Sequence, residues 1–210
     1  MVNKTRFISF EGIDFSGKTT QVVLLKEKLE AYGENVLVMR EPGGTTISER
    51  VRDILLDKDH LEMTNICEIL LYSAARHQLV YEKISKELQS GNFVIADRYV
   101  DSTTAYQGYG RKIPMNFVKH VNRIATNGLM PNITFYLDLD LLELRNRIKK
   151  YKGSVDRLET EGNEFYQRIR KGYLKIAEHD KDRVVIINAK QEINKIHTEI
   201  WEFVRKILNL

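Results

Sequence analysis

The stretch that decides the fold is Phe7–Thr20, which reads FISFEGIDFSGKTT. A short apolar run leads into the spacing GxxxxGK[ST], and an apolar helical pattern follows, which is the strand–loop–helix context of a phosphate-binding loop. The glycines let the backbone wrap closely, so that N–H groups and the helix N-terminus face phosphates. Lys18 is expected to reach the β- and γ-phosphates, and the Thr19 hydroxyl to ligate Mg²⁺. The loop predicts binding of a nucleoside triphosphate by Gly12, Ile13, Asp14, Phe15, Ser16, Gly17, Lys18, Thr19 and Thr20.

Continuous apolar runs alternate with helical patterns along the chain. Such runs, without polar alternation, are typical of parallel strands that are covered on both faces. We therefore predict an α/β fold, a P-loop NTPase-type doubly wound parallel sheet of five strands flanked by helices. Residues 1–210 contain no Ser/Gly-rich linker or repeat, so we expect a single domain. The expected strands are Phe7–Phe10, Val36–Met39, Phe93–Ala96, Ile133–Leu137 and Val184–Ile187.

Composition says more about the cellular compartment of the protein than about its function. The 210 residues include one cysteine, Cys67, which excludes an internal disulfide framework. No apolar stretch is long enough to span a membrane, and the first ten residues lack the apolar run of a signal peptide. We therefore expect a cytoplasmic protein. The net charge of +4 admits three kinds of partner, namely nucleic acid, an anionic membrane or a small phosphorylated substrate.

Acidic and basic side chains follow the third expected strand. Asp97 ends this strand in the Walker-B pattern, which places a carboxylate near Mg²⁺, and Arg98 next to it could clamp a phosphate. Asp14 in the loop is a further metal candidate, although an Asx-turn residue is the alternative. The metal candidates are therefore Thr19, Asp14 and Asp97.

The second strand and the third helix carry further candidates. The sequence REPGGT, residues 40–45, follows at the carboxyl end of a strand, where ligands bind in open α/β sheets. Tyr72 and Arg76 are spaced i, i+4 and could stack on a base and hydrogen-bond its edge. A core tyrosine and a surface arginine are the alternative reading of this pair. The substrate candidates are Arg40, Glu41, Arg52, Tyr72, Arg76, Asp97, Arg98, Ser102, Thr103, Tyr106 and Gln107.

These stretches together resemble the thymidylate kinase family. FEGIDFSGKTT, REPGGT, YSAAR, DRYVDSTTAYQGYGR, NGLMPNITFYLDL and DRLE occur in the order that the family shows. The resemblance implies transfer of the γ-phosphate of ATP to the 5′-phosphate of dTMP, giving dTDP in dTTP synthesis. It places Arg98 on the dTMP phosphate, with help from Arg40 or Arg52, and Tyr72 against thymine where the family usually has Phe. It also places Arg76 at thymine O4, Thr103 and Gln107 near the base, and Tyr106 against the sugar C2′ position.

Phe15 departs from the family, which has Arg or a small residue at this position of the loop. The resemblance therefore points to the bacterial-type branch, in which a basic lid supplies the catalytic charge. In this chain the lid would be the segment at about 145–160, which is rich in Lys and Arg. We expect the catalytic residues to be Lys18, Asp14, Arg98, Arg147 and Arg157, with a solvated basic helix face as the alternative for the lid. The resemblance further suggests a homodimer.

Two other functions compete with this one. A deoxynucleoside kinase would share the phosphate loop and the acid–arginine pair, but it would not need several arginines around a neutral acceptor. A nucleic-acid-binding ATPase or switch protein would use the basic charge, yet no basic–aromatic interleaving or guanine-reading motif occurs. We therefore expect dTMP and ATP as partners, and neither nucleic acid nor a membrane.

Overall fold

Five parallel strands form the centre of the molecule in the computed structural model, which describes residues 6–151 and 162–208. Their order across the sheet is β2-β3-β1-β4-β5, so β1 lies in the middle and hydrogen-bonds to β3 on one side and to β4 on the other. The predicted doubly wound parallel sheet is confirmed. The strands are β1 (Phe7–Glu11), β2 (Val36–Arg40), β3 (Phe93–Asp97), β4 (Ile133–Asp138) and β5 (Val184–Asn188).

Each strand runs one residue beyond its predicted apolar run. The added residues are all polar: Glu11, Arg40, Asp97, Asp138 and Asn188. They lie together because the carboxyl ends of parallel strands meet at one edge of the sheet. β1 and β3 are buried and β4 nearly so, as expected for strands that are covered on both faces. The edge strands β2 and β5 are partly exposed, because an edge strand has a neighbouring strand on one side only.

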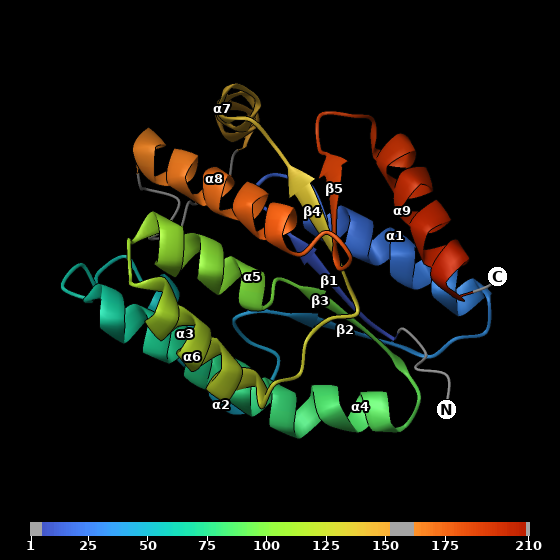
Figure 1. Cartoon of the computed structure of the whole chain (residues 1–210), viewed down its shortest axis with the longest axis horizontal. Helices are drawn as coiled ribbons and strands as arrows, with labels where there is room; N and C mark the ends of the chain where they lie inside the picture. Colours follow the sequence, from blue (N-terminus) through green and yellow to red (C-terminus); the bar gives the residue numbers. More distant parts are fainter. Residues whose placement is uncertain (1–5, 152–161, 209–210) are drawn as a thin grey trace.

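Helices cover both faces of the sheet (Figure 1). On one face α1 (Lys18–Ala31) packs against α9 (Ile193–Leu208), and the other face carries the α3, α5 and α8 regions (Figure 1). The remaining elements are α2 (Thr46–Leu56), α3 (Asn65–Leu79), α4 (Ser85–Gln89), α5 (Val100–Thr103), α6 (Met115–Thr126), α7 (Leu141–Lys150) and α8 (Asn163–His179), with π-helical segments η1 (Val80–Ile84) and η2 (Thr104–Gly110). No helix in the two described ranges is long and apolar enough to cross a membrane.

The phosphate loop joins β1 to α1 by a turn that requires glycine. Gly12 has a φ of 141°, and a Cβ atom there would lie 2.6 Å from the Leu137 carbonyl oxygen of β4. At the other end of α1, Gly33 has a φ of 82°, and its N–H donates to the Glu30 carbonyl. Gly33 therefore ends α1 in the left-handed conformation that is common just after a helix.

The π-helical segment η2 continues α5 and packs along α8. The approach is close, because a Cβ atom at Gly172 of α8 would lie 2.8 Å from the Tyr109 ring. Wider π-type turns within helices frequently occur at functional sites. Together α5 and η2 carry four of the predicted substrate residues, Ser102, Thr103, Tyr106 and Gln107, to the carboxyl edge of the sheet.

Candidate active site

A pocket opens at the carboxyl ends of β1, β2 and β3. It encloses about 840 Å³, open solvent at its mouth included. Every residue that the sequence analysis names as a substrate candidate lines it, together with three residues of the phosphate loop. The lining residues are Asp14, Lys18, Thr19, Arg40, Glu41, Pro42, Arg52, Leu56, Tyr72, Arg76, Asp97, Arg98, Ser102, Thr103, Tyr106 and Gln107.

At the floor of the pocket, the phosphate loop meets the Walker-B carboxylate. The Thr19 hydroxyl donates to Asp97 Oδ2 at 2.6 Å, so the loop and the end of β3 present their oxygens side by side. Lys18 is buried, and its ammonium group donates to the Ile13 carbonyl at 3.0 Å. Burial lowers the pKa of Lys18 to about 8, with a further contribution from the Arg98 charge. A hydroxyl beside a carboxylate is the hard oxygen set that suits Mg²⁺.

Arg98 joins the phosphate loop to the pocket. Its guanidinium donates to the Gly12 carbonyl at 2.9 Å and to the Ser102 hydroxyl at 3.2 Å, and it forms an ion pair with Asp14. The Tyr106 hydroxyl also donates to Asp14, at 3.3 Å. Burial acts to raise the pKa of Asp14, but the charges of Arg98 and Lys18 outweigh it and lower that pKa. Asp14 is therefore ionised at neutral pH and has a cationic partner.

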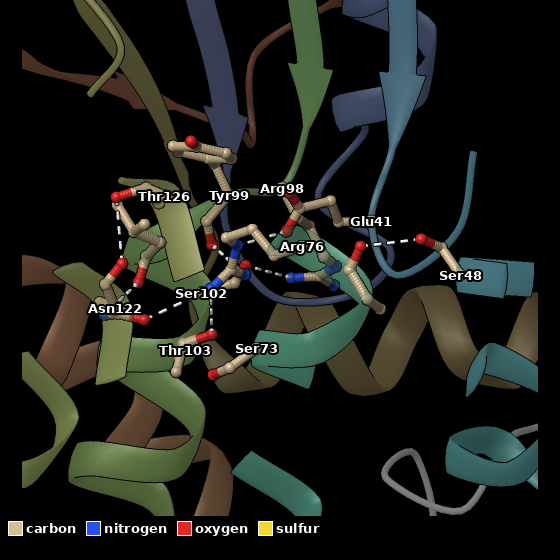
Figure 2. Close-up of polar contacts among 12 residues, drawn as sticks. Glu41, Ser48, Ser73, Arg76, Arg98, Tyr99, Ser102, Thr103, Asn122 and Thr126 are labelled. Atoms are coloured by element: carbon tan, nitrogen blue, oxygen red, sulfur yellow. Dashed lines mark hydrogen bonds and ion pairs between the residues drawn. The ribbon is translucent and has the colours of Figure 1, made fainter. Parts of the chain in front are cut away.

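Arg76 is enclosed by protein groups (Figure 2). Its side chain is 2% exposed and pairs with Glu41 through Nε at 2.7 Å. Nη1 donates to Thr103 at 2.9 Å and to Asn122 at 3.3 Å, and Nη2 donates to the Tyr99 carbonyl at 3.1 Å. Burial raises the pKa of Glu41 although Arg76 acts to lower it.

The alternative of a core tyrosine and a surface arginine is therefore wrong for the i, i+4 pair. Arg76 is buried, whereas Tyr72 is partly exposed and lines the pocket beside it. A hydrophobic helix face in the sequence does not distinguish the two arrangements, since the partners of Arg76 come from four other segments of the chain.

Arg40 and Arg52 lie at the mouth of the pocket beside the REPGGT turn. Both donate to the Pro42 carbonyl, at 3.2 Å and 2.9 Å. Arg40 also pairs with Glu49 of α2, and that carboxylate accepts the Gly44 N–H at 2.6 Å. The turn is thus tied to α2, and it holds two guanidinium groups on the same wall.

Of the two predicted lid arginines, the structure describes Arg147. Arg147 of α7 contacts the phosphate loop, since its guanidinium donates to the Phe15 carbonyl at 2.9 Å and to the Ala189 carbonyl at 2.7 Å. The Phe15 ring meets the Tyr151 ring edge-on, with the centroids 5.1 Å apart. Arg157 and most of the predicted lid fall in 152–161, outside the described residues.

Sequence analysis missed a buried acid below Arg98. Glu11 is 0% exposed and accepts hydrogen bonds from the Tyr99 N–H at 2.7 Å, the Ser102 hydroxyl at 2.6 Å and the Tyr173 hydroxyl at 3.0 Å. Burial, with the neighbouring Asp101 carboxylate, raises the pKa of Glu11 to about 7 against these hydrogen bonds and Arg98. Its place directly after an apolar run and before the loop glycine was the available signal, because a buried carboxylate requires partners.

A second missed acid, Glu68 of α3, braces η2. It accepts the Gln107 amide at 3.0 Å and pairs with Arg111 through two nitrogen atoms, both at 3.1 Å. The Arg111 guanidinium also lies 4.7 Å from the centre of the Phe165 ring. Glu68 therefore holds the side-chain amide of Gln107, which lines the pocket, in a fixed orientation.

The fold and the site together define a class of protein. A triphosphate loop in the centre of a doubly wound sheet binds a phosphate donor. A neighbouring pocket with four arginines, Arg40, Arg52, Arg76 and Arg98, suits an anionic acceptor. The class is a P-loop kinase that acts on a small phosphorylated molecule.

Comparisons with known proteins narrow the class to one family. The family model for thymidylate kinase matches residues 10–200. The chain is 46% identical over 205 residues to a thymidylate kinase of Thermoanaerobacter sp. (strain X514), which covers 98% of this chain and 100% of that protein. A thymidylate kinase of Chlorobaculum parvum is 45% identical, with 92% of each chain covered. The crystal structure of thymidylate kinase from Ehrlichia chaffeensis superposes with a TM-score of 0.78 at 36% identity, covering 95% of this chain and 98% of that one. The chain belongs to the thymidylate kinase family.

Proposed function

We propose that the arginine-lined pocket holds dTMP while the chain, as a member of the thymidylate kinase family, phosphorylates it with ATP to give dTDP and ADP. An oxygen of the 5′-phosphate forms a bond to the γ-phosphorus, and the bond from that phosphorus to the β,γ-bridging oxygen breaks. The observation that carries the proposal is the position of Arg98. Its guanidinium contacts both the phosphate loop and the pocket, where the donor and acceptor phosphates would meet.

The acceptor contacts follow from the pocket lining. Arg98 holds the 5′-phosphate, with Arg40 or Arg52 at the mouth, and the partly exposed Tyr72 ring stacks on thymine. Arg76 has five N–H groups, and four hydrogen bonds to the described part of the chain leave one Nη2 N–H for thymine O4. Tyr106 limits space at the sugar C2′ position.

Mg²⁺ would be held by Thr19 and Asp97, with Asp14 close to the acceptor side. The 2.6 Å contact between the Thr19 hydroxyl and the Asp97 carboxylate gives the oxygen donors that fit this ion, with phosphate oxygens as further ligands. When bound, the ion neutralises charge on the β- and γ-phosphates. Lys18 supplies a second positive charge from the loop, and its lowered pKa leaves it mostly protonated at neutral pH.

Arg147 and Arg157 remain candidates for the additional catalytic cation. Arg147 lies at the phosphate loop, where its bonds to the Phe15 and Ala189 carbonyls hold the guanidinium on the donor side. A cation there stabilises charge on the transferring group.

A monophosphate panel with ATP tests the proposal. Turnover of dTMP, dUMP and thymidine is measured by a coupled ADP assay, with an Arg98→Met variant alongside. We expect dTMP to be turned over fastest, and Arg98→Met to lose that preference for a phosphorylated acceptor. Faster turnover of thymidine than of dTMP would refute the proposal in favour of a deoxynucleoside kinase.

We also propose that the chain acts as one nucleoside-monophosphate-kinase-like domain, in the cytoplasm, as a homodimer. Helices α2, α3 and α6 adjoin one another (Figure 1), and each carries exposed apolar side chains at helical spacing. A second copy would bury these residues, which are Ile47, Ile54, Ile66, Leu70, Phe117 and Ile124. Leu70→Glu should convert a dimer to a monomer in analytical ultracentrifugation, and a monomeric parent protein would refute this arrangement.

A further inference from the structure

Glu11 has no part in the phosphoryl transfer described above, yet it connects three elements beneath the pocket. It is the last residue of β1, and it accepts hydrogen bonds from Tyr99 after β3, Ser102 in α5 and Tyr173 in α8. A buried carboxylate costs free energy that an apolar residue at this position would not cost. This cost directs attention to the group that Glu11 and its three donors hold in place.

Arg98 has a backbone conformation that needs support. Its φ is 75°, in the left-handed region that a residue with a Cβ atom adopts only with strain. The Arg98 N–H donates to the Phe10 carbonyl at 2.9 Å, and the next N–H, of Tyr99, donates to the Glu11 carboxylate at 2.7 Å. Two consecutive residues of β1 thus hold the peptide groups on either side of the Arg98 Cα atom.

The guanidinium of Arg98 is reached by a second route. The Ser102 hydroxyl donates to Glu11 Oε2 at 2.6 Å, which leaves its lone pairs to accept Arg98 Nη1 at 3.2 Å. The Tyr173 hydroxyl lies 2.9 Å from Ser102 Oγ and 3.0 Å from the same carboxylate oxygen. Glu11 therefore constrains Arg98 at its backbone through Tyr99 and at its guanidinium through Ser102.

We infer that Glu11 and Tyr173 are positioning residues that aim Arg98 at the phosphate of the acceptor. The inference rests on the proposed role of Arg98 in holding that phosphate. It predicts that changes at Glu11 or Tyr173, which lie outside the pocket lining, weaken recognition of the phosphate group alone.

The test compares dTMP with thymidine, which lacks the phosphate. Calorimetry gives the dissociation constant of each for the parent protein and for Glu11→Gln, Tyr173→Phe and Arg98→Met. The dissociation constant for thymidine divided by that for dTMP measures the phosphate-dependent part of binding. We expect this ratio to fall about tenfold in Glu11→Gln and about fivefold in Tyr173→Phe, as for loss of a hydrogen bond to a charged group. Thymidine affinity and the KM for ATP should not change.

Tyr136→Phe is the matched control. The Tyr136 hydroxyl also donates to a carboxylate, that of Asp138 at 2.7 Å, and its ring stacks on Tyr173 with the centroids 4.8 Å apart. This variant removes a comparable hydrogen bond from the same aromatic stack without touching Glu11. The ratio for Tyr136→Phe should equal that of the parent protein.

The outcomes separate the two proposals. If Arg98→Met leaves the ratio unchanged, the role of Arg98 is refuted. If Arg98→Met reduces the ratio while Glu11→Gln and Tyr173→Phe keep it within twofold of the parent, only the positioning inference is overturned. Equal losses for thymidine and dTMP would indicate a structural role and would also overturn it. Tyr173→Phe in the Arg98→Met background should cause no further loss, and it decides the matter if Glu11→Gln does not fold.

Discussion

Replacing Arg76 by Met should reveal two separate effects of this residue, one on the stability of the protein and one on its affinity for dTMP. The Arg76–Glu41 ion pair is 2.7 Å long, and its side chains are 2% and 4% exposed. Glu41 Oε1 has no hydrogen-bond partner in the described residues, so Arg76→Met would leave the whole carboxylate without compensation. Breaking one side of such a pair costs about 3–5 kcal/mol, and we expect a loss of that size in the free energy of unfolding at pH 8.

The loss should depend on pH in a defined direction. Burial already raises the pKa of Glu41 against the effect of Arg76, and removal of Arg76 raises that pKa further. A carboxyl whose pKa is higher in the folded state contributes stability below its unfolded pKa, and that stability is lost as the pH rises through the folded value. The deficit of Arg76→Met relative to the parent protein should therefore be smaller at pH 5.5 than at pH 8.

A double variant supplies the decisive comparison. Glu41→Met in the Arg76→Met background removes the uncompensated charge and should restore most of the stability, because apolar replacement of a buried pair is often neutral. The dTMP affinity should remain low, since the N–H group for thymine O4 is still absent. Urea unfolding at both pH values, calorimetry with dTMP and the KM for ATP are the measurements. Recovery of dTMP affinity together with stability would show that Arg76 only supports the wall, and a loss below about 1 kcal/mol in the single variant would refute the ion-pair argument.

Three further predictions concern the phosphate loop and its surroundings. Lys18→Ala should lower turnover by about 10³-fold or more, measured by rapid quench with saturating ATP, and a loss under tenfold would exclude stabilisation of the transferring group. Arg147→Ala should lower the turnover number more than it lowers the affinity for ATP. An unchanged turnover number in the variant would show that Arg147 is not a catalytic cation. Burial raises the pKa of Glu11 from 4.5 to about 7. The parent protein should therefore lose about 3 kcal/mol of unfolding free energy relative to Glu11→Gln as the pH rises from 4.5 to above 7. A difference that stays constant with pH in urea unfolding would contradict the raised pKa.

Local sequence was sufficient for the strands and for the residues at their ends. A continuous apolar run that stops at a charged residue marks both a strand and the edge at which its polar side chain emerges, as in β3, which ends at Asp97. The residues lining the pocket could be listed for the same reason. Their partners could not, because Glu11 contacts residues 88 to 162 positions away in the chain.

Glu11 and Tyr173, neither of which is a site candidate in the sequence, share a physical feature. Glu11 lies between apolar strand residues and the loop glycine, and Tyr173 lies on the apolar face of α8 together with Phe165 and Ile169. In the sequence each looks like an ordinary member of its element. Their hydrogen bonds to each other and to Ser102 form only when β1, α5 and α8 are packed together. Hydrophobic periodicity records that a residue is buried, but it does not record which polar atom it meets.

Because β1 lies in the centre of the sheet, other segments approach the phosphate loop after it from two sides. Segments after β2 and β3 form the wall of the proposed acceptor pocket. Arg147 of α7, which also donates to the Ala189 carbonyl after β5, contacts the phosphate loop from the other side. β1 and its loop contact both sides, and Asp97 and Arg98 join the loop to the pocket wall. Under the proposed function, substitutions in the pocket wall away from these two residues can therefore change the choice of monophosphate without redesign of the ATP side. For protein engineering, exchange of residues 40–111 with Asp97 and Arg98 retained tests how far acceptor choice evolves independently of the donor.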